Sequence, residues 1–231
     1  MATIYKFDDK WRLIGSYADI TRNTYYHAVA CCGGDHIFLQ FRNSALIPCA
    51  KSLLEFEMIG STAKFIRSVN LAPGTATGTC CMAWDGEYLH VMDAVNLMGW
   101  ITDYYKCDVD GNLITSSGIT GLYIGVGDYL TGGCFNGEYL MLIDNDGKII
   151  QFDPETLTGY VKTTIGSANS MYALAFDGEF YYTFHYTAVG NCSIYKYDEN
   201  FNFISTTILP LPVTARWHGL DTDGEFWYLC K

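Results

Sequence analysis

Paired carboxylates are the first chemistry to look for in a chain with 25 acidic residues. Hydrolysis of a glycosidic bond needs an acid and a base that converge on one bond. Asp221 falls on a segment that should face the interior of the molecule, and Asp128 and Asp103 fall near comparable positions. One inward acid does not make an acid/base pair, so we assign no catalytic residue from the carboxylates.

Metal-binding and nucleophilic patterns are equally sparse. His27 and His218 could share a metal ion, but no third ligand accompanies them. The nine cysteines include no Cys-x-x-Cys pair and no zinc spacing, so we expect mostly reduced cysteines that serve as small core residues. The stretch 108–112 resembles the start of a calcium loop but lacks the downstream glutamate. We therefore predict no metal and no cofactor.

Aromatic and arginine side chains form a stronger candidate site, because flat rings with polar edges and a forked guanidinium suit sugar and protein surfaces. Those that lie near a central opening of the fold are the best candidates. The predicted ligand-binding residues are Tyr26, His27, Trp100, Tyr172, Arg216, Trp217 and His218. The alternative is that these side chains only pack between structural units.

Composition restricts the partners further. Fourteen basic residues against 25 acidic ones give the 231-residue chain a net charge of −11, which disfavours binding to nucleic acid and to anionic membranes. The content of 49% hydrophobic and 17% charged residues is typical of a folded protein. No signal peptide and no membrane-inserted segment is expected. We predict a cytoplasmic protein, or one assembled intracellularly into a larger particle such as a virion.

A short motif recurs along the chain and indicates an internal repeat. Its copies are Asp85-Gly-Glu-Tyr88, Asn136-Gly-Glu-Tyr139, Asp177-Gly-Glu-Phe180 and Asp223-Gly-Glu-Phe226, with a degenerate copy at Gly33-Gly-Asp-His36. Their spacing of roughly 40 to 50 residues is typical of propeller blades. Five such units account for the whole chain when the count continues from the last copy through the N-terminus.

A second motif supports this circular count. Tyr105-Lys-Cys-Asp108, Ile150-Gln-Phe-Asp153 and Tyr195-Lys-Tyr-Asp198 follow the first motif in their units, and Leu54-Glu-Phe-Glu57 is a weaker copy. The remaining copy, Tyr5-Lys-Phe-Asp8, stands at the N-terminus. The last unit should therefore be completed by the N-terminal segment, which would leave no incomplete blade at the closure.

Each unit is predicted to contain four short strands, with an Asp-Gly or Asn-Gly hairpin whose two turn residues tolerate a positive φ. We predict an all-β, single-domain five-bladed propeller over residues 1–231, with four antiparallel strands per blade. Small residues at the first strands fit a narrow axis. The alternative is a β-sandwich with coincidental repeats. The predicted blades are 27–68, 78–116, 130–165, 171–208, and 216–231 together with 3–16.

With these motifs, the sequence resembles the blades of NHL/WD-type and glutamine-cyclotransferase-like β-propellers. The resemblance covers all five units and implies the blade fold. It does not imply one activity, since propellers serve in binding, scaffolding and many kinds of catalysis.

Propellers have two unlike faces. The two hairpin turns of each blade share one, here called the turn face, and the other connections form the loop-rich face. Most acidic residues fall on the turn face, where they could bind cations or a basic partner, or could only shape the hairpins. The acids assigned to this face are Asp35, Asp85, Glu87, Glu138, Asp177, Glu179, Asp223 and Glu225 at first turns, and Asp8, Asp9, Glu57, Asp108, Asp110, Asp153, Glu155, Asp198 and Glu199 at second turns.

The sequence favours a non-catalytic binding or scaffold protein that engages a protein or glycan partner through the loop-rich face. A role as a subunit of a larger assembly is part of this hypothesis. A polysaccharide hydrolase or lyase, or a cyclotransferase-like enzyme with its site at the axial opening, is the alternative. A structural module whose acidic face contacts a basic partner is a third hypothesis.

Overall fold

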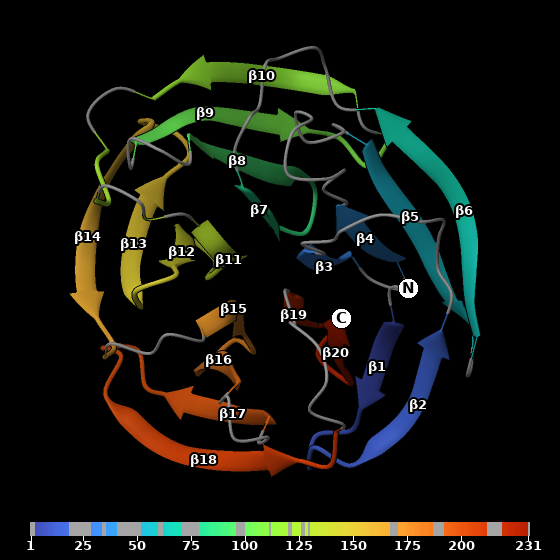
Figure 1. Cartoon of the computed structure of the whole chain (residues 1–231). Coiled ribbons are helices and arrows are strands. Elements are labelled where there is room, and N and C mark those ends of the chain that lie inside the picture. Colours follow the sequence, from blue (N-terminus) through green and yellow to red (C-terminus); the bar gives the residue numbers. More distant parts are fainter. Residues whose placement is uncertain are drawn as a thin grey trace.

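In the computed structural model, the described residues are 3–18, 29–33, 36–40, 52–59, 62–70, 79–95, 100–110, 112–119, 122–125, 128, 130–166, 171–186, 192–211 and 219–230. They form five four-stranded antiparallel sheets that stand around a central axis like the blades of a propeller (Figure 1). This confirms the predicted all-β, five-bladed fold.

The strands of each blade run in order from the axis outward. Blade 1 comprises β3 (Val29–Gly33), β4 (His36–Gln40), β5 (Ser52–Ile59) and β6 (Thr62–Asn70). Blade 2 comprises β7 (Thr79–Trp84), β8 (Leu89–Val95), β9 (Trp100–Cys107) and β10 (Leu113–Gly118). Blade 3 comprises β11 (Leu130–Phe135), β12 (Leu140–Asp144), β13 (Lys148–Asp153) and β14 (Thr158–Thr164). Blade 4 comprises β15 (Met171–Phe176), β16 (Tyr181–Tyr186), β17 (Cys192–Tyr197) and β18 (Phe203–Leu209).

Blade 5 joins the two ends of the chain, as the second sequence motif predicts. Its strands are β19 (Gly219–Thr222), β20 (Trp227–Cys230), β1 (Thr3–Phe7) and β2 (Leu13–Ala18). β1 pairs antiparallel with β20, with Ile4 opposite Cys230 and Phe7 opposite Trp227. The side chains of Ile4, Phe7 and Cys230 are buried, so this closure also contributes to the hydrophobic core.

The innermost strands pack closely around the axis, which explains their small residues. A β-carbon added to Gly132 would lie 2.6 Å from the backbone nitrogen of Leu174 and 2.7 Å from the Cα of Ala173 in the next blade. Real β-carbons do not approach backbone atoms this closely, so β11 requires glycine at this point. The prediction of small residues at the first strands is confirmed here.

The Asp-Gly hairpins differ in detail from the predicted turn. Only the glycine takes a positive φ, as in Gly86 at 101° and Gly178 at 101°. The aspartate instead caps the turn through its side chain: Asp177 Oδ1 accepts the N–H groups of Glu179 and Phe180 at 2.9 and 2.7 Å. The same arrangement recurs at the other three copies of the motif, so these carboxylates and the Asn136 amide have a structural role.

The second turns are capped in the same manner. Asp198 Oδ1 accepts the N–H groups of Asn200 and Asn202, and its Oδ2 accepts the side-chain amide of Asn202. These hydrogen bonds lower the pKa of Asp198, and the bond from the side-chain amide of Asn202 contributes most. Many acids of the turn face are therefore hairpin caps, which agrees with the interpretation that these acids shape the hairpins.

Three of these second turns contain a large apolar residue in the left-handed conformation. The three are Trp11, Leu157 and Phe201. Trp11 (φ 58°) stacks on Trp227 at 4.7 Å between ring centroids and reaches Tyr182 in blade 4 at 6.0 Å. Phe201 (φ 62°) stacks on Tyr181 at 4.3 Å. Trp11 thus links two blades on the turn face.

The outermost strands carry β-bulges that protect the free sheet edges. In four blades the register skips one isoleucine of the outer strand, which then has no opposite residue. The four are Ile14, Ile66, Ile114 and Ile204, with exposed fractions between 37% and 53%. Bulges increase local twist, which opposes edge-to-edge pairing with a second molecule.

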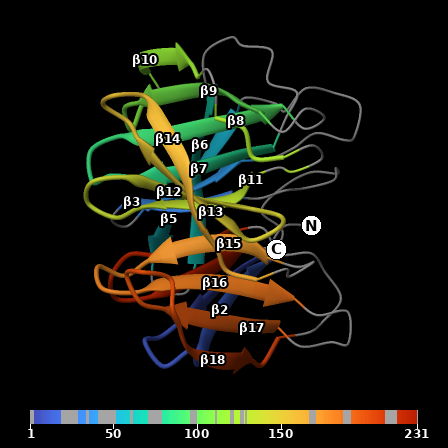
Figure 2. The ribbon, with the colours of Figure 1, turned by 90° about the vertical axis from the view of Figure 1, so that its left-hand side faces the viewer.

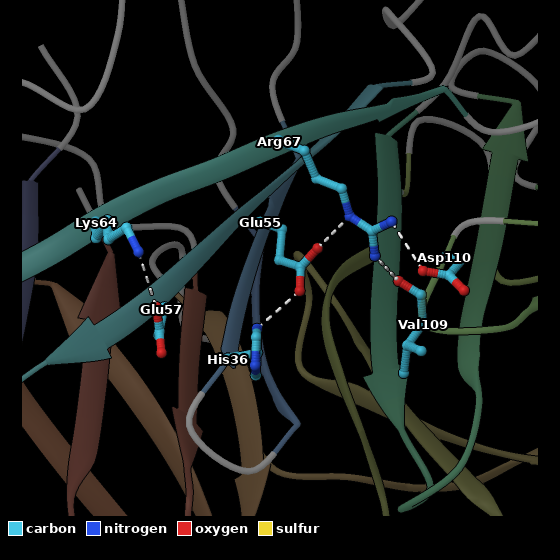
Figure 3. A network of polar contacts seen from close by, with 7 residues as sticks. All are labelled: His36, Glu55, Glu57, Lys64, Arg67, Val109 and Asp110. Atoms are coloured by element: carbon cyan, nitrogen blue, oxygen red, sulfur yellow. Dashed lines mark hydrogen bonds and ion pairs between the residues drawn. The ribbon is translucent and has the colours of Figure 1, made fainter.

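Blade 1 is attached to blade 2 by a polar network (Figure 3). Glu55, which is buried, contacts His36 Nδ1 at 2.7 Å and Arg67 Nε at 2.5 Å. Arg67 also donates to the Asp110 carboxylate at 2.8 Å and to the carbonyl oxygen of Val109 at 2.6 Å, both in the β9–β10 turn. The guanidinium therefore joins the outer strand of one blade to the next blade.

Candidate functional site

The two faces of the ring differ in how their strands are connected. Connections on the turn face contain at most five residues, and Figure 2 shows these hairpins on the left, opposite the two chain ends. Longer connections join the strand ends on the opposite face, including residues 19–28, 41–51, 71–78, 119–129 and 210–218. The topology thus agrees with the predicted division into a turn face and a loop-rich face.

The predicted binding residues fall largely outside the structural description. Tyr26, His27, Arg216, Trp217 and His218 lie outside the described residues. The backbone of Tyr172 lies in β15, near the end of this innermost strand that meets the loop-rich face. Trp100 begins β9, the third strand from the axis, so its backbone lies on the same face but farther out. The proposed contact set stays a prediction.

Acid chemistry at the axis is limited to one carboxylate among the innermost strands that the structure describes. Asp221 lies in β19, whereas β3, β7, β11 and β15 contain no Asp or Glu. Asp103, the weaker candidate, lies in β9 opposite Asp93 and therefore away from the axis. Burial, and to a smaller extent the negative charge of Asp221, raises the pKa of the Cys134 and Cys230 thiols. Both thiols therefore stay protonated, and a protonated thiol is a poor nucleophile.

A buried charged cluster does occur on the loop-rich face, and it involves Asp128. Lys148, which begins β13, donates its ammonium group to the carbonyl oxygen of Ile124 at 2.5 Å and to the Asp128 carboxylate. Asp144, which ends β12 and is fully buried, lies 3.6 Å from the same ammonium group. The Oδ1 atom of Asp144 also accepts the N–H groups of Asp146 and Lys148 at 2.9 and 2.8 Å.

The electrostatics of this cluster favour a structural role. Burial raises the pKa of Asp144. Burial opposes the charge of Lys148, but the hydrogen bond to Asp128 and the nearby carboxylates outweigh it and raise the pKa of Lys148. The ammonium group therefore stays protonated between two acids, and it fixes the connection between blades 2 and 3 to the β12–β13 turn.

Gly125 shows how closely this connection is held. Its φ is 134°, and an added β-carbon would lie 2.1 Å from Asp128 Oδ2 and 3.0 Å from Lys148 Nζ. Sequence reasoning placed Asp128 near the axis but missed Lys148 and Asp144. The three-residue connection 145–147, the shortest on the loop-rich face, was the available signal.

Within the part of the chain that the structure describes, no group of three or more His, Cys, Asp or Glu side chains is arranged to hold a metal ion. The same residues include no helix with the length and apolar character needed to cross a membrane.

Comparison with known proteins supports the architecture. No family model and no curated protein matches the sequence. Among solved structures, glutaminyl cyclase from Myxococcus xanthus is similar over 94% of this chain and 97% of its own, with a TM-score of 0.57 and 10% identity. The computationally designed Ika8 protein aligns with 94% of this chain and 61% of its own, with a TM-score of 0.46 and 10% identity. Apo AztD from Citrobacter koseri aligns with 84% of this chain and 50% of its own, with a TM-score of 0.41 and 12% identity. Of these, only the cyclase has a TM-score above 0.5, and at 10% identity its likeness shows the propeller fold alone.

Proposed function

We propose that this propeller is a non-catalytic binding or scaffold protein that engages a protein or glycan through its loop-rich face. The observation that carries the proposal is the contrast between the two faces. The hairpins of the turn face use their acids as caps, whereas the longest connections belong to the loop-rich face. The contact set is the one predicted from sequence, centred on Arg216 and Trp217.

The described residues near the axis support binding rather than catalysis. The innermost strands supply Asp221 as their single carboxylate, and the Asp128 and Asp144 pair is held by Lys148. An acid/base mechanism needs two groups with separate tasks that can both reach one substrate. Fully buried Asp144 cannot reach one. Membership of a larger assembly, such as a virion, remains part of this proposal.

Single substitutions at the proposed contact set test the binding function. Fluorescently labelled protein is applied to a glycan array, and a photo-crosslinking residue placed at position 215, next to Arg216 in the sequence, captures protein partners in extracts. Trp217→Ala and Arg216→Ala should abolish specific binding and leave the thermal unfolding midpoint unchanged. Tyr160→Ala is the matched control, since Tyr160 is 57% exposed on the outer strand β14. Equal loss in all three variants, or in none, would contradict the proposal.

A cyclotransferase-like activity is the second candidate, and the similarity to the Myxococcus xanthus cyclase along nearly the whole chain favours it. Cyclisation of an N-terminal glutaminyl residue releases ammonia, which a coupled assay measures on a glutaminyl dipeptide. Turnover that disappears in Asp221→Asn, with folding retained, would establish this function in place of pure binding. A polysaccharide hydrolase or lyase would instead release reducing or unsaturated ends.

A further inference from the structure

A cavity of about 300 Å³ lies between blades 2 and 3 on the turn face, on the opposite side of the ring from the proposed binding surface. Blade 2 contributes Asp85, His90 and Lys106 to its lining. Blade 3 contributes Phe135 and the first turn with Glu138 and Tyr139, and the second turn with Asp153 and Glu155. The volume is sufficient for a side-chain-sized ligand.

The corresponding groove between blades 4 and 5 shows how aromatic side chains can fill this position. Tyr182 of blade 4 stands five residues after the turn aspartate Asp177, and its hydroxyl donates to Asp177 Oδ2 at 2.7 Å. Trp11 from the second turn of blade 5 packs over Tyr182, as described above. The groove between blades 4 and 5 is therefore filled by two aromatic rings.

Blades 2 and 3 differ from blades 4 and 5 at both positions. His90 replaces the tyrosine, with its Nε2 atom 2.7 Å from Asp85 Oδ2. The second turn of blade 3 presents Pro154 and Glu155 to the groove, and its left-handed residue, Leu157, packs against the cluster around Tyr104 and Phe152. The smaller ring and the missing aromatic residue leave the cavity open.

His90 forms a fixed wall of the cavity. It is 2% exposed, and its ring is parallel to that of Phe135, with an interplanar angle of 7° and a centroid distance of 5.9 Å. The Asp85 carboxylate can only accept, so Nε2 carries the hydrogen, and Nδ1 accepts the Tyr104 hydroxyl at 2.8 Å. Burial is the largest influence on the pKa of His90 and lowers it, so the ring stays neutral near pH 7.

The charges around the cavity define its ligand. Asp85, Glu138, Asp153 and Glu155 supply four carboxylates, and Lys106 supplies one ammonium group. That ammonium group already lies over the Tyr88 ring, 3.9 Å from its centroid. Asp85 is held by His90 and by its own turn, and Asp153 Oδ1 likewise accepts the N–H groups of Glu155 and Thr156 at 2.8 and 3.2 Å. Glu138 and Glu155 are therefore the lining acids that do not cap a hairpin, and they lie beside the aromatic rings. Carboxylates next to aromatic faces favour an organic cation.

We propose that this cavity binds an organic cation of the alkylammonium or guanidinium class, either the side chain of a lysine or arginine residue or a free amine. The aromatic rings supply the walls for the apolar part of the ligand, and Glu138 and Glu155 supply the charge. The site is separate from the loop-rich face, so it stands or falls independently of the proposed function.

Titration by NMR with defined probes tests the proposal. The probes are Nα-acetyl-arginine amide, Nα-acetyl-lysine amide and agmatine, and Nα-acetyl-citrulline amide is the uncharged control of similar shape. The cations should cause saturable shifts of the amide signals of Gly137 and Glu155, whereas the citrulline compound should not. Tighter binding of agmatine would identify a free amine as the ligand, and tighter binding of Nα-acetyl-arginine amide or Nα-acetyl-lysine amide would identify a protein side chain.

Matched charge variants provide the decisive comparison. Glu138→Gln with Glu155→Gln should weaken binding about tenfold, because each exposed ion pair contributes up to about fivefold. Glu179→Gln with Glu199→Gln makes the equivalent changes in the turns of blade 4 and should leave the affinity unchanged. His90→Tyr, which introduces the residue found at this position in blades 4 and 5, should narrow the cavity and abolish binding. Equal shifts with the citrulline compound, no saturable shift with any cation, or equal weakening in both double variants would overturn the proposal.

Discussion

His185 should make the stability of this propeller sensitive to mild acid. It lies in β16 at 5% exposure, stacks on Tyr195 at 3.8 Å between ring centroids, and shares a hydrogen bond with the Thr183 hydroxyl at 2.8 Å. Burial lowers its pKa from 6.5 to about 4. The unfolded chain therefore takes up a proton below about pH 6.5 that the folded protein does not accept until about pH 4, so acid favours unfolding across this window.

The magnitude follows from the width of that window. One pKa unit corresponds to about 1.4 kcal/mol, so the complete effect is about 3 kcal/mol, of which about 2 kcal/mol is reached at about pH 5. His185→Phe keeps an aromatic ring on Tyr195 but cannot take up a proton. The variant loses the hydrogen bond to Thr183, which should lower its stability by about 1 kcal/mol at every pH.

Urea unfolding monitored by tryptophan fluorescence measures the difference. Between about pH 7.5 and about pH 5, the unmodified protein should lose about 2 kcal/mol more unfolding free energy than His185→Phe. Carboxylates that titrate in the same range are common to both proteins and cancel in the comparison. Parallel stability curves for the two proteins would refute the claim that burial depresses the pKa of His185.

Three further substitutions test the packing and charge arguments by urea unfolding. Lys148→Met should lower the unfolding free energy by about 3 kcal/mol, because buried Asp144 loses its counter-charge. Adding Asp144→Asn should recover part of that loss, and no recovery would mean that the two charges are not coupled. Arg67→Ala should cost about 1 to 3 kcal/mol by leaving the buried Glu55 carboxylate with only His36 and by detaching blade 1 from blade 2, whereas Lys64→Ala, which removes an exposed pair with Glu57, should have little effect. Gly132→Ala should lower the unfolding free energy by about 3 kcal/mol or prevent folding, because its β-carbon meets the backbone of β15. Gly15→Ala should be nearly neutral, because its β-carbon would lie at ordinary van der Waals distance from Tyr17, 3.6 Å from the hydroxyl oxygen.

The fold was predictable because its evidence is local and repeated. Asp-Gly turns at regular spacing mark each hairpin, and the displaced copy ending at Asp8 indicates closure through β1. The conformation of the turn aspartates was not predictable from propensity alone, because a side-chain cap competes with a positive φ at the same residue.

The charged cluster and the cavity depend on contacts between segments distant in sequence. Lys148 meets Asp128 across the junction of two blades, and the cavity over His90 exists only because the second turn of blade 3 lacks the aromatic residue that blade 5 supplies. No spacing rule shows such pairings, although His90 can be noticed in hindsight as a departure from Tyr182 and Tyr228. The aromatic set on the loop-rich face remains a prediction from composition and topology.

Pairing of β1 with β20 has a consequence for synthesis of the chain. The β1–β2 hairpin leaves the ribosome before the rest of the ring, yet its sheet partners are the last described strands to emerge. A two-stranded hairpin is marginally stable in water, so this nascent segment stays incompletely ordered while the other blades form. A stalled polypeptide lacking residues 219–230 would present an unsatisfied strand edge at β1, and such intermediates are prone to aggregate until β19 and β20 have been synthesised.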